Sequence, residues 1–452
     1  MSSYGMYSLE KLTDVADGHG VDVIFLTDNL TDTIQYGLPP LRNIFWMDFS
    51  RRSVLSRGAG NYLDAIAKEN ARQSDVLYVP GVEVCPRFYW TGSLRKGDLV
   101  CHDHQRNIIV LGCDDPDIIA NIPETRGFTW PRDAGWIIGT RLLLFLLVVT
   151  CCGVVCMPRF LARRSPYSKR EIRRSMVIGL VLPVVLLCVV VDFCAARVPS
   201  FRIYGRSGSW ASHRRTIDYL RSKDLVHYWA HPEAVDHHDF AASDGPAALR
   251  LAARLWNPSF AADTRPYPEA LKVTSGYSGF GGIYEDANTL LNPGSAWDAA
   301  LREYTAGKRK HVPLCFGEML YHYEGQAGKR MRNVETMVWA ADKRQQTICL
   351  ALGAGRFYAR RNRDEQRLVL DRWEVGRNES GVPEIRYAVS SAVPGEDVTL
   401  TLVKDGAVAD TVATNTPVAG AFMDESAAKR GYYRLVVRGR GLRLAANPLF
   451  VK

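Results

Sequence analysis

Two long apolar runs, separated by a strongly basic segment, dominate the hydropathy pattern of this chain. The runs are Trp136–Met157 and Met176–Ala196, each of about 21 residues and therefore about 32 Å long as a helix. A hydrocarbon core is about 30 Å thick, so the pattern predicts a transmembrane hairpin, residues 136–196, rather than a pair of buried core helices. The joining loop, 158–175, holds seven basic residues and a single acid, Glu171. The positive-inside rule places this loop in the cytoplasm and the soluble domains outside it.

Before the hairpin, apolar positions alternate between helical and strand spacing. A helix is expected to start at Ser8, its N-cap, and to end near Gly20, and a further helix covers Tyr62–Gln73. Continuous apolar runs at 21–28, 75–84 and 107–112 are typical of buried strands. Polar residues stand at the strand ends. This order predicts a βα barrel or a doubly wound sheet whose chemistry lies at those ends.

The same alternation resumes after the hairpin and then gives way to a period of two. Helices are expected at His213–Lys223 and Val334–Gly353, and strands at 225–232, 280–285 and 312–323. From Asp364 onward, positions such as Val398, Leu400 and Leu402 alternate strictly, which predicts a small all-β sandwich of about 85 residues. The predicted divisions are residues 1–135, 136–196, 197–363 and 364–452.

Composition narrows the possible partners. The 452 residues are 47% hydrophobic and carry a formal net charge of +9, of which the basic loop supplies +6. The charge is therefore mainly a signal of topology, and no nucleic-acid partner is expected. Five of the ten cysteines lie in the apolar runs, and the others have no CxxC spacing, so neither a disulfide framework nor a thiolate zinc site is predicted.

Several short motifs then appear in a specific order. They are SLEKLTDVADGHGVDVIFLTDN, LYVPGVEV, RNIIVLG, WAHP, FGGIYE and GRFY. Together they resemble the PHP superfamily (polymerase and histidinol phosphatase domains), which contains metal-dependent phosphoesterases and related hydrolases. QYGLPPLRNI and PRFYWTG look like a membrane-associated branch of it. The resemblance implies an α/β fold, a PHP-like distorted (β/α)7 barrel interrupted by the two-helix transmembrane hairpin and followed by the C-terminal β-sandwich.

The resemblance also implies a metal site for Zn, Mn or Fe. The residues that match or lie near its ligand positions are Glu83, His104, His231, Glu318 and His322. Such ions lower the pKa of a bound water from about 15.7 to about 7 and hold a phosphoryl group for displacement.

The chain departs from the family pattern at two ligand positions. Asn29 and Asn107 stand where the family has histidine, and an amide is a poorer ligand for borderline-soft metals. The family's opening His-x-His strand is also absent, as is an export signal, and both are expected if the natural chain begins upstream of Met1. These departures indicate a degenerate, incomplete metal site.

Two functions follow from these patterns. The first is a membrane-anchored PHP-like protein, much reduced in catalysis, that binds an anionic small molecule in the barrel mouth or a protein partner on the sandwich. The second is an active metal-dependent phosphoesterase with a reduced site. A serine hydrolase is disfavoured because Gly276–Gly279 lacks the GxSxG spacing.

Overall fold

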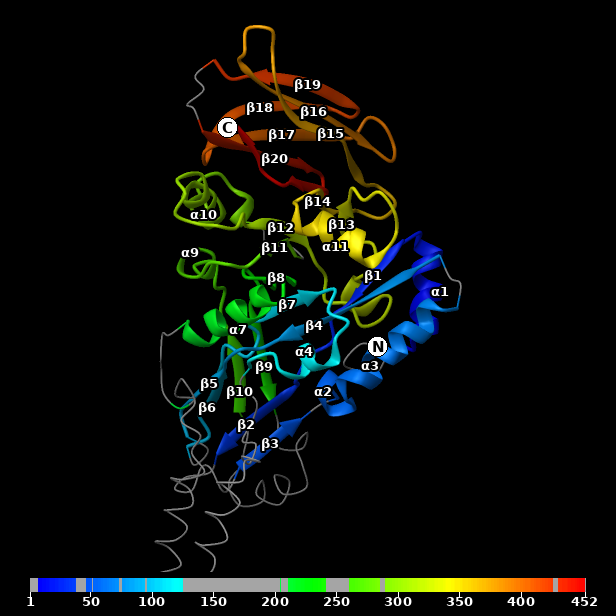
Figure 1. The fold of residues 1–452 in the computed structure, drawn as a ribbon, viewed down its shortest axis with the longest axis vertical. Coiled ribbons are helices and arrows are strands. Elements are labelled where there is room, and N and C mark those ends of the chain that lie inside the picture. Colours follow the sequence, from blue (N-terminus) through cyan, green and yellow to red (C-terminus); the bar gives the residue numbers. More distant parts are fainter. Residues whose placement is uncertain are drawn as a thin grey trace, which may run out of the picture.

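The computed structural model describes residues 7–37, 46–50, 52–72, 75–93, 96–124, 204, 210–240, 260–284, 289–425 and 430–451. A six-stranded sheet in the order β1-β4-β7-β8-β11-β12 lies at the centre of the molecule (Figure 1). Its strands are β1 (Val23–Leu26), β4 (Leu77–Val84), β7 (Ile108–Leu111), β8 (Val226–Trp229), β11 (Gly279–Ile283) and β12 (Leu314–Gly317). Neighbouring strands are parallel except at β7, which is antiparallel to both β4 and β8.

This sheet is open, which corrects the predicted (β/α)7 barrel. Among the described strands, none joins β12 back to β1. The chain after β12 forms β13 (Val334–Val338) and β14 (Phe357–Arg361), and β14 pairs with β21 (Arg443–Ala446) near the C-terminus. The reversed direction of β7 also breaks the all-parallel ladder of the predicted barrel.

The predicted transmembrane hairpin, residues 136–196, lies outside the residues that the structure describes. Of the helices in the described ranges, none is long and apolar enough to cross a membrane. The predicted localisation as an integral membrane protein therefore has no support among the described helices.

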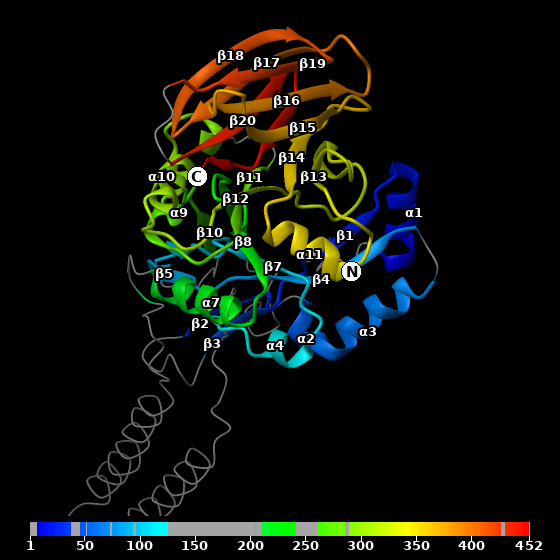
Figure 2. The same ribbon diagram turned by 45° about the horizontal axis from the view of Figure 1, so that its top comes forward.

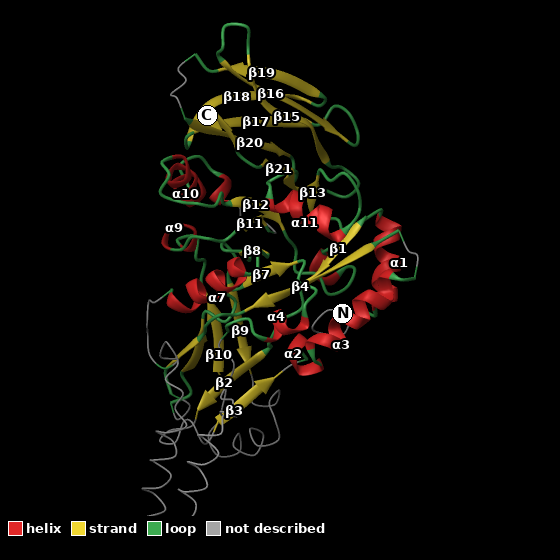
Figure 3. Cartoon of the chain, in the orientation of Figure 1, coloured by secondary structure: helices red, strands yellow, loops and turns green. Residues whose placement is uncertain are grey.

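Most of the described helices cover one face of the central sheet, the first face, whereas the last helix of the chain lies on the opposite, second face (Figures 2 and 3). The described helices are α1 (Leu9–His19), α2 (Val54–Arg57), α3 (Ala59–Asn70), α4 (Pro116–Ala120), α7 (Ala211–Ser222), α9 (Ala270–Val273), α10 (Ala296–Thr305) and α11 (Gln345–Gly353), with 3-10 turns η2 (Thr289–Leu291) and η3 (Gln326–Gly328). The predicted start of α1 is confirmed, because the Ser8 side chain accepts a hydrogen bond from the Lys11 backbone N–H. Its end is confirmed as well, since Gly20 closes the helix with a φ of 62°.

Successive side chains of each central strand point to opposite faces, and each face has its own core. In β7, Ile108 and Val110 join the large core that includes side chains of α1, α3, α7 and α10. Ile109 and Leu111 point the other way and join a smaller core with Ile348 of α11. The second face is thus covered chiefly by one short helix.

A smaller sheet lies at the end of the molecule farthest from the C-terminal strands (Figure 1). Its order is β5-β6-β10-β9, formed by β5 (Tyr89–Thr91), β6 (Leu99–His102), β9 (Asp236–Phe240) and β10 (Phe260–Thr264), and a hairpin is formed by β2 (Thr33–Gly37) and β3 (Trp46–Ser50). Trp90, Phe260 and Tyr36 pack edge to face in its core.

The C-terminal residues form two antiparallel sheets at the opposite end (Figure 3). One has the order β13-β14-β21-β20-β17-β18, with β22 on β20, and the other the order β15-β16-β19. The remaining strands are β15 (Leu368–Arg377), β16 (Pro383–Ser391), β17 (Asp397–Lys404), β18 (Ala407–Asn415), β19 (Val418–Met423), β20 (Gly431–Gly439) and β22 (Leu449–Val451). The first part of the predicted helix Val334–Gly353 is wrong, because Val334–Val338 pairs with β14 as a strand.

Candidate functional site at the carboxyl edge of the central sheet

A cavity of about 1240 Å³ lies against the second face of the central sheet and extends to its edge. We call it the edge cavity. Because β1, β4, β8, β11 and β12 are mutually parallel in direction, their carboxyl ends share one edge, where ligands of open α/β sheets bind. The residues that line the cavity from these strand ends are Asp28, Asn29, Glu83, His231, Tyr284 and Glu318.

Asn107 reaches the same edge from the opposite direction. It precedes β7, which runs antiparallel to its neighbours, so the start of this strand lies beside the ends of the others. Its Nδ2 donates hydrogen bonds to Glu83 Oε1 at 2.6 Å and to Gln105 Oε1 at 2.7 Å. Its Oδ1 is buried and has no hydrogen-bond partner among the described residues.

Glu83 interacts with several of the residues at this edge of the sheet. Burial raises its pKa, while the charge of His231 and the hydrogen bond from Asn107 oppose that rise without cancelling it. Asn29 continues the pairing beyond β1 through a parallel bridge to Glu83. Glu83 is therefore a carboxyl group that a nearby positive charge would help to ionise.

His231 and Glu318 form a second pair. Glu318 Oε1 accepts the backbone N–H of His231 and lies 3.6 Å from its Nδ1. Burial opposes protonation of His231, but the hydrogen bond to Glu318 and the charges of Glu318 and Glu83 outweigh it and raise the pKa. His231 also has a φ of 27°, which is rare for a residue with a Cβ and costs about 1–3 kcal/mol. The fold therefore holds this residue in a strained position.

A third group of side chains, around Asp236, lies where the edge cavity meets the smaller sheet. Asp236 of β9 lies 3.1 Å from His104 Nε2 and 2.7 Å from His238 Nε2. Burial alone would raise the pKa of Asp236, but its contact with His104 and the nearby histidine charges lower it. The His238 side chain is 62% exposed, whereas that of His104 is 8% exposed. Asp236 and His238 both line the edge cavity.

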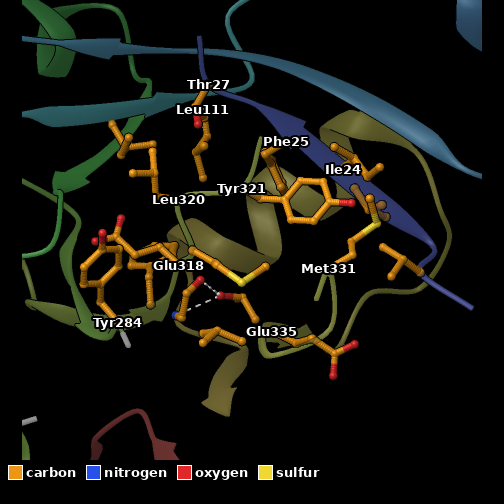
Figure 4. A pocket seen from close by; sticks show the side chains of 18 of the residues that line it. Ile24, Phe25, Thr27, Leu111, Tyr284, Glu318, Leu320, Tyr321, Met331 and Glu335 are labelled. Carbon is orange, nitrogen blue, oxygen red and sulfur yellow. Dashed lines mark hydrogen bonds between the residues drawn. The ribbon is translucent and has the colours of Figure 1, made fainter. Parts of the chain in front are cut away.

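The rest of the cavity wall combines apolar side chains with charged ones such as Arg332, Glu335 and Arg360. Figure 4 shows Tyr284 and Glu318 on one side and Ile24, Phe25 and Met331 on the other. Ile348 and Leu352 of α11, the helix on the second face, also line the cavity. The cavity therefore combines an acidic strand-end side with a wall of apolar and charged side chains.

The metal-ligand set predicted from the sequence does not form. No three His, Cys, Asp or Glu side chains in the described ranges are placed to hold a metal ion. The residues of the predicted site form hydrogen bonds with one another instead. The side-chain amide of Asn107 donates to Glu83, and Glu318 accepts the backbone N–H of His231. The predicted metal-binding group is therefore corrected for the described residues, whereas a Zn, Mn or Fe cofactor in an incomplete site and metal-dependent hydrolase chemistry stay predictions.

The structure nevertheless places most of the predicted site residues around the edge cavity. Asn29, Glu83, His231, Glu318 and His322 all line the edge cavity, and Asn107 touches it through Glu83. His104 lies behind this wall, on Asp236.

The sequence analysis missed many of the lining residues, including four polar ones near the strand ends. These four are Gln105, Glu233, Asp236 and Tyr284. Tyr284 directly follows a strand, which is a signal that could have identified it. Asp236 lies in a polar stretch without an apolar pattern, so only tertiary pairing of β9 reveals it.

No protein-family model, curated protein or solved structure matches this chain. The resemblance to the PHP superfamily therefore stays a prediction.

Proposed function

We propose that this protein is a binding protein whose edge cavity holds a small organic ligand without a metal ion. The observation that carries this function is the cavity itself. Its volume of about 1240 Å³ is larger than the roughly 300–1,000 Å³ of most small-molecule sites, and it combines apolar walls with a few convergent polar groups. The volume is sufficient for an organic molecule, and apolar side chains with a few convergent polar groups are typical of sites that hold one.

The internal pairing of the polar groups supports binding over catalysis. Glu83 is held by Asn107, and Glu318 by His231, so the groups are fixed in position before any ligand arrives. Fixed groups cost little ordering entropy on binding. The strained backbone of His231 at the centre of this arrangement supports a site that the fold maintains for function. Under this proposal the protein keeps a PHP-like edge without the metal chemistry of that superfamily.

The test is titration of the purified full chain with N-phenyl-1-naphthylamine, a neutral apolar dye that fluoresces when it leaves water. We expect saturable binding of one dye per chain. Leu320 lines the cavity and is 44% exposed, so Leu320→Trp should narrow the entrance without disturbing the core. This variant should weaken dye binding about tenfold, or about 1.4 kcal/mol.

The matched control is Leu350→Trp, which changes a 63% exposed leucine of α11 that does not line the cavity. It should leave dye binding unchanged. Metal content is measured on the same samples by inductively coupled plasma mass spectrometry. Absence of saturable binding, an equal loss in both variants, or binding that disappears with EDTA would each overturn the proposal.

A further inference from the structure

Carboxyl groups dominate the strand-end side of the edge cavity. Five of them line it there: Asp28, Glu83, Glu233, Asp236 and Glu318. The lysine and arginine side chains that line the cavity all come from residues 332–367. Arg332 and Arg360 are already bound to Glu335, with nitrogen-to-oxygen distances of 2.9 and 2.6 Å. Both arginines are therefore engaged by Glu335, and none of Glu83, Glu233, Asp236 and Glu318 forms an ion pair with a lysine or arginine in the described part of the chain.

Histidine balances only part of this charge. His231 is shared between Glu318 and Glu83, and His104 and His238 both contact Asp236. Glu233 is bound by neutral donors instead, because its Oε1 accepts hydrogen bonds from Thr289 Oγ1 and from the backbone N–H of Leu290 at 3.1 Å. Glu233 thus forms no ion pair with a lysine, arginine or histidine in the described part of the chain.

The buried atoms on this side that lack a hydrogen bond within the described residues include two acceptors, Glu233 Oε2 and Asn107 Oδ1. Asn107 is only 3% exposed, and its amide nitrogen binds Glu83 and Gln105, which line the cavity. A buried acceptor without a donor costs about 1–3 kcal/mol. The ligand that fits this side must supply donors rather than acceptors.

Aromatic and apolar groups complete the recognition surface. The Tyr284 ring lies 4.9 Å from the His231 ring, and Tyr228 stacks on Phe316 with centroids 4.3 Å apart. Such ring faces favour a cation that has left water. Ile24, Phe25 and Met331 lie on the other side of the cavity (Figure 4). An apolar group of the ligand would be buried there.

We infer that the ligand of the edge cavity is an organic cation, in which an ammonium or amidinium group is attached to an apolar body. The charged group lies against Glu83 and Glu233 and donates hydrogen bonds to them, while the apolar body fills the space beside Ile24 and Phe25. This inference rests on the proposed function and replaces the anionic ligand that was expected from the sequence.

The experiment is displacement of N-phenyl-1-naphthylamine by three ligands of equal chain length at pH 7: octylammonium, octanol and octanoate. Their apolar parts are alike, so differences in displacement report the head group alone. We expect octylammonium to displace the dye at a concentration at least tenfold lower than octanol, and octanoate to be the weakest. Glu83→Gln and Glu233→Gln should each reduce the preference for octylammonium over octanol to about threefold or less.

The control is Asp342→Asn. Asp342 also lines the cavity, but Arg344 already binds it at 2.6 Å, so this variant should keep the preference for the cation. If the dye binds and octanol displaces it as well as octylammonium does, the cation inference fails and the proposed function stands. A preference for octanoate, or an equal effect of Asp342→Asn, would also overturn the inference. If the dye does not bind at all, the proposed function itself fails.

Discussion

Arg434 of β20 binds Asp298 of α10 through two hydrogen bonds, from Nε to Oδ1 at 2.7 Å and from Nη2 to Oδ2 at 2.6 Å. Both side chains have no exposed surface. The guanidinium also donates to the backbone carbonyl groups of Leu291 and Asn292 and lies over the Trp297 ring. One ion pair therefore joins the C-terminal sheets to the helices of the central sheet.

Removing one partner of this pair should be costly. Arg434→Met leaves the Asp298 carboxylate buried without its cation, which destabilises a protein by about 3–5 kcal/mol. The free energy of unfolding in urea measures the effect. Arg386→Met is the control, because Arg386 is half-exposed and pairs with Glu384 at 2.6 Å; it should cost less than about 1 kcal/mol. Equal losses in the two variants would show that Arg434 does not join the two parts.

The hydrogen bond from Asn107 to Glu83 gives a second prediction. Asn107→Ala removes this donor, so the pKa of Glu83, which burial already raises, should rise further. The folded protein then keeps a proton that the unfolded chain has lost, so its stability falls as pH rises above the ordinary value of 4.5. We expect a loss of about 1–3 kcal/mol at pH 8 and a smaller loss at pH 4, measured by urea unfolding. Asn121→Ala, at an exposed asparagine, should show no such dependence on pH.

A third prediction concerns acid stability. His213 lies between the rings of Trp210 and Trp229, and burial lowers its pKa to about 3. Below pH 6.5 the unfolded chain binds a proton that the folded protein excludes, so stability falls by about 1.4 kcal/mol per pH unit toward pH 3. His213→Phe keeps a planar ring and removes the titration. Its unfolding free energy should change less between pH 6 and pH 4 than that of the unchanged protein, and an identical slope would contradict the assignment.

The N-cap of α1 gives a local prediction. Ser8→Ala removes the acceptor for the Lys11 N–H and should cost about 1 kcal/mol, whereas Ser8→Asp should retain most of the stability. Hydrogen exchange of the first turn of α1 measures both effects. Protection that is unchanged in Ser8→Ala would exclude a capping role.

The sequence determined features that depend on neighbours along the chain. The cap at Ser8, the left-handed Gly20 and the apolar runs that became β1, β4 and β7 follow from local hydrogen bonding and side-chain volume. The residues Glu83, His231 and Glu318 were grouped because they match or lie near ligand positions of the family that the chain resembles, at or near strand ends, and all three line the edge cavity.

Only the tertiary structure decided how these elements meet. The direction of β7 and the pairing of β14 with β21 depend on contacts between residues far apart in sequence, and they turned a predicted closed barrel into an open sheet. The same long-range geometry placed Asn107 on Glu83 and Asp236 beside His104. Hydrophobic periodicity fixes which face of a strand is buried, but the strand that lies beside it is chosen by packing of the whole chain, and that choice made the edge cavity.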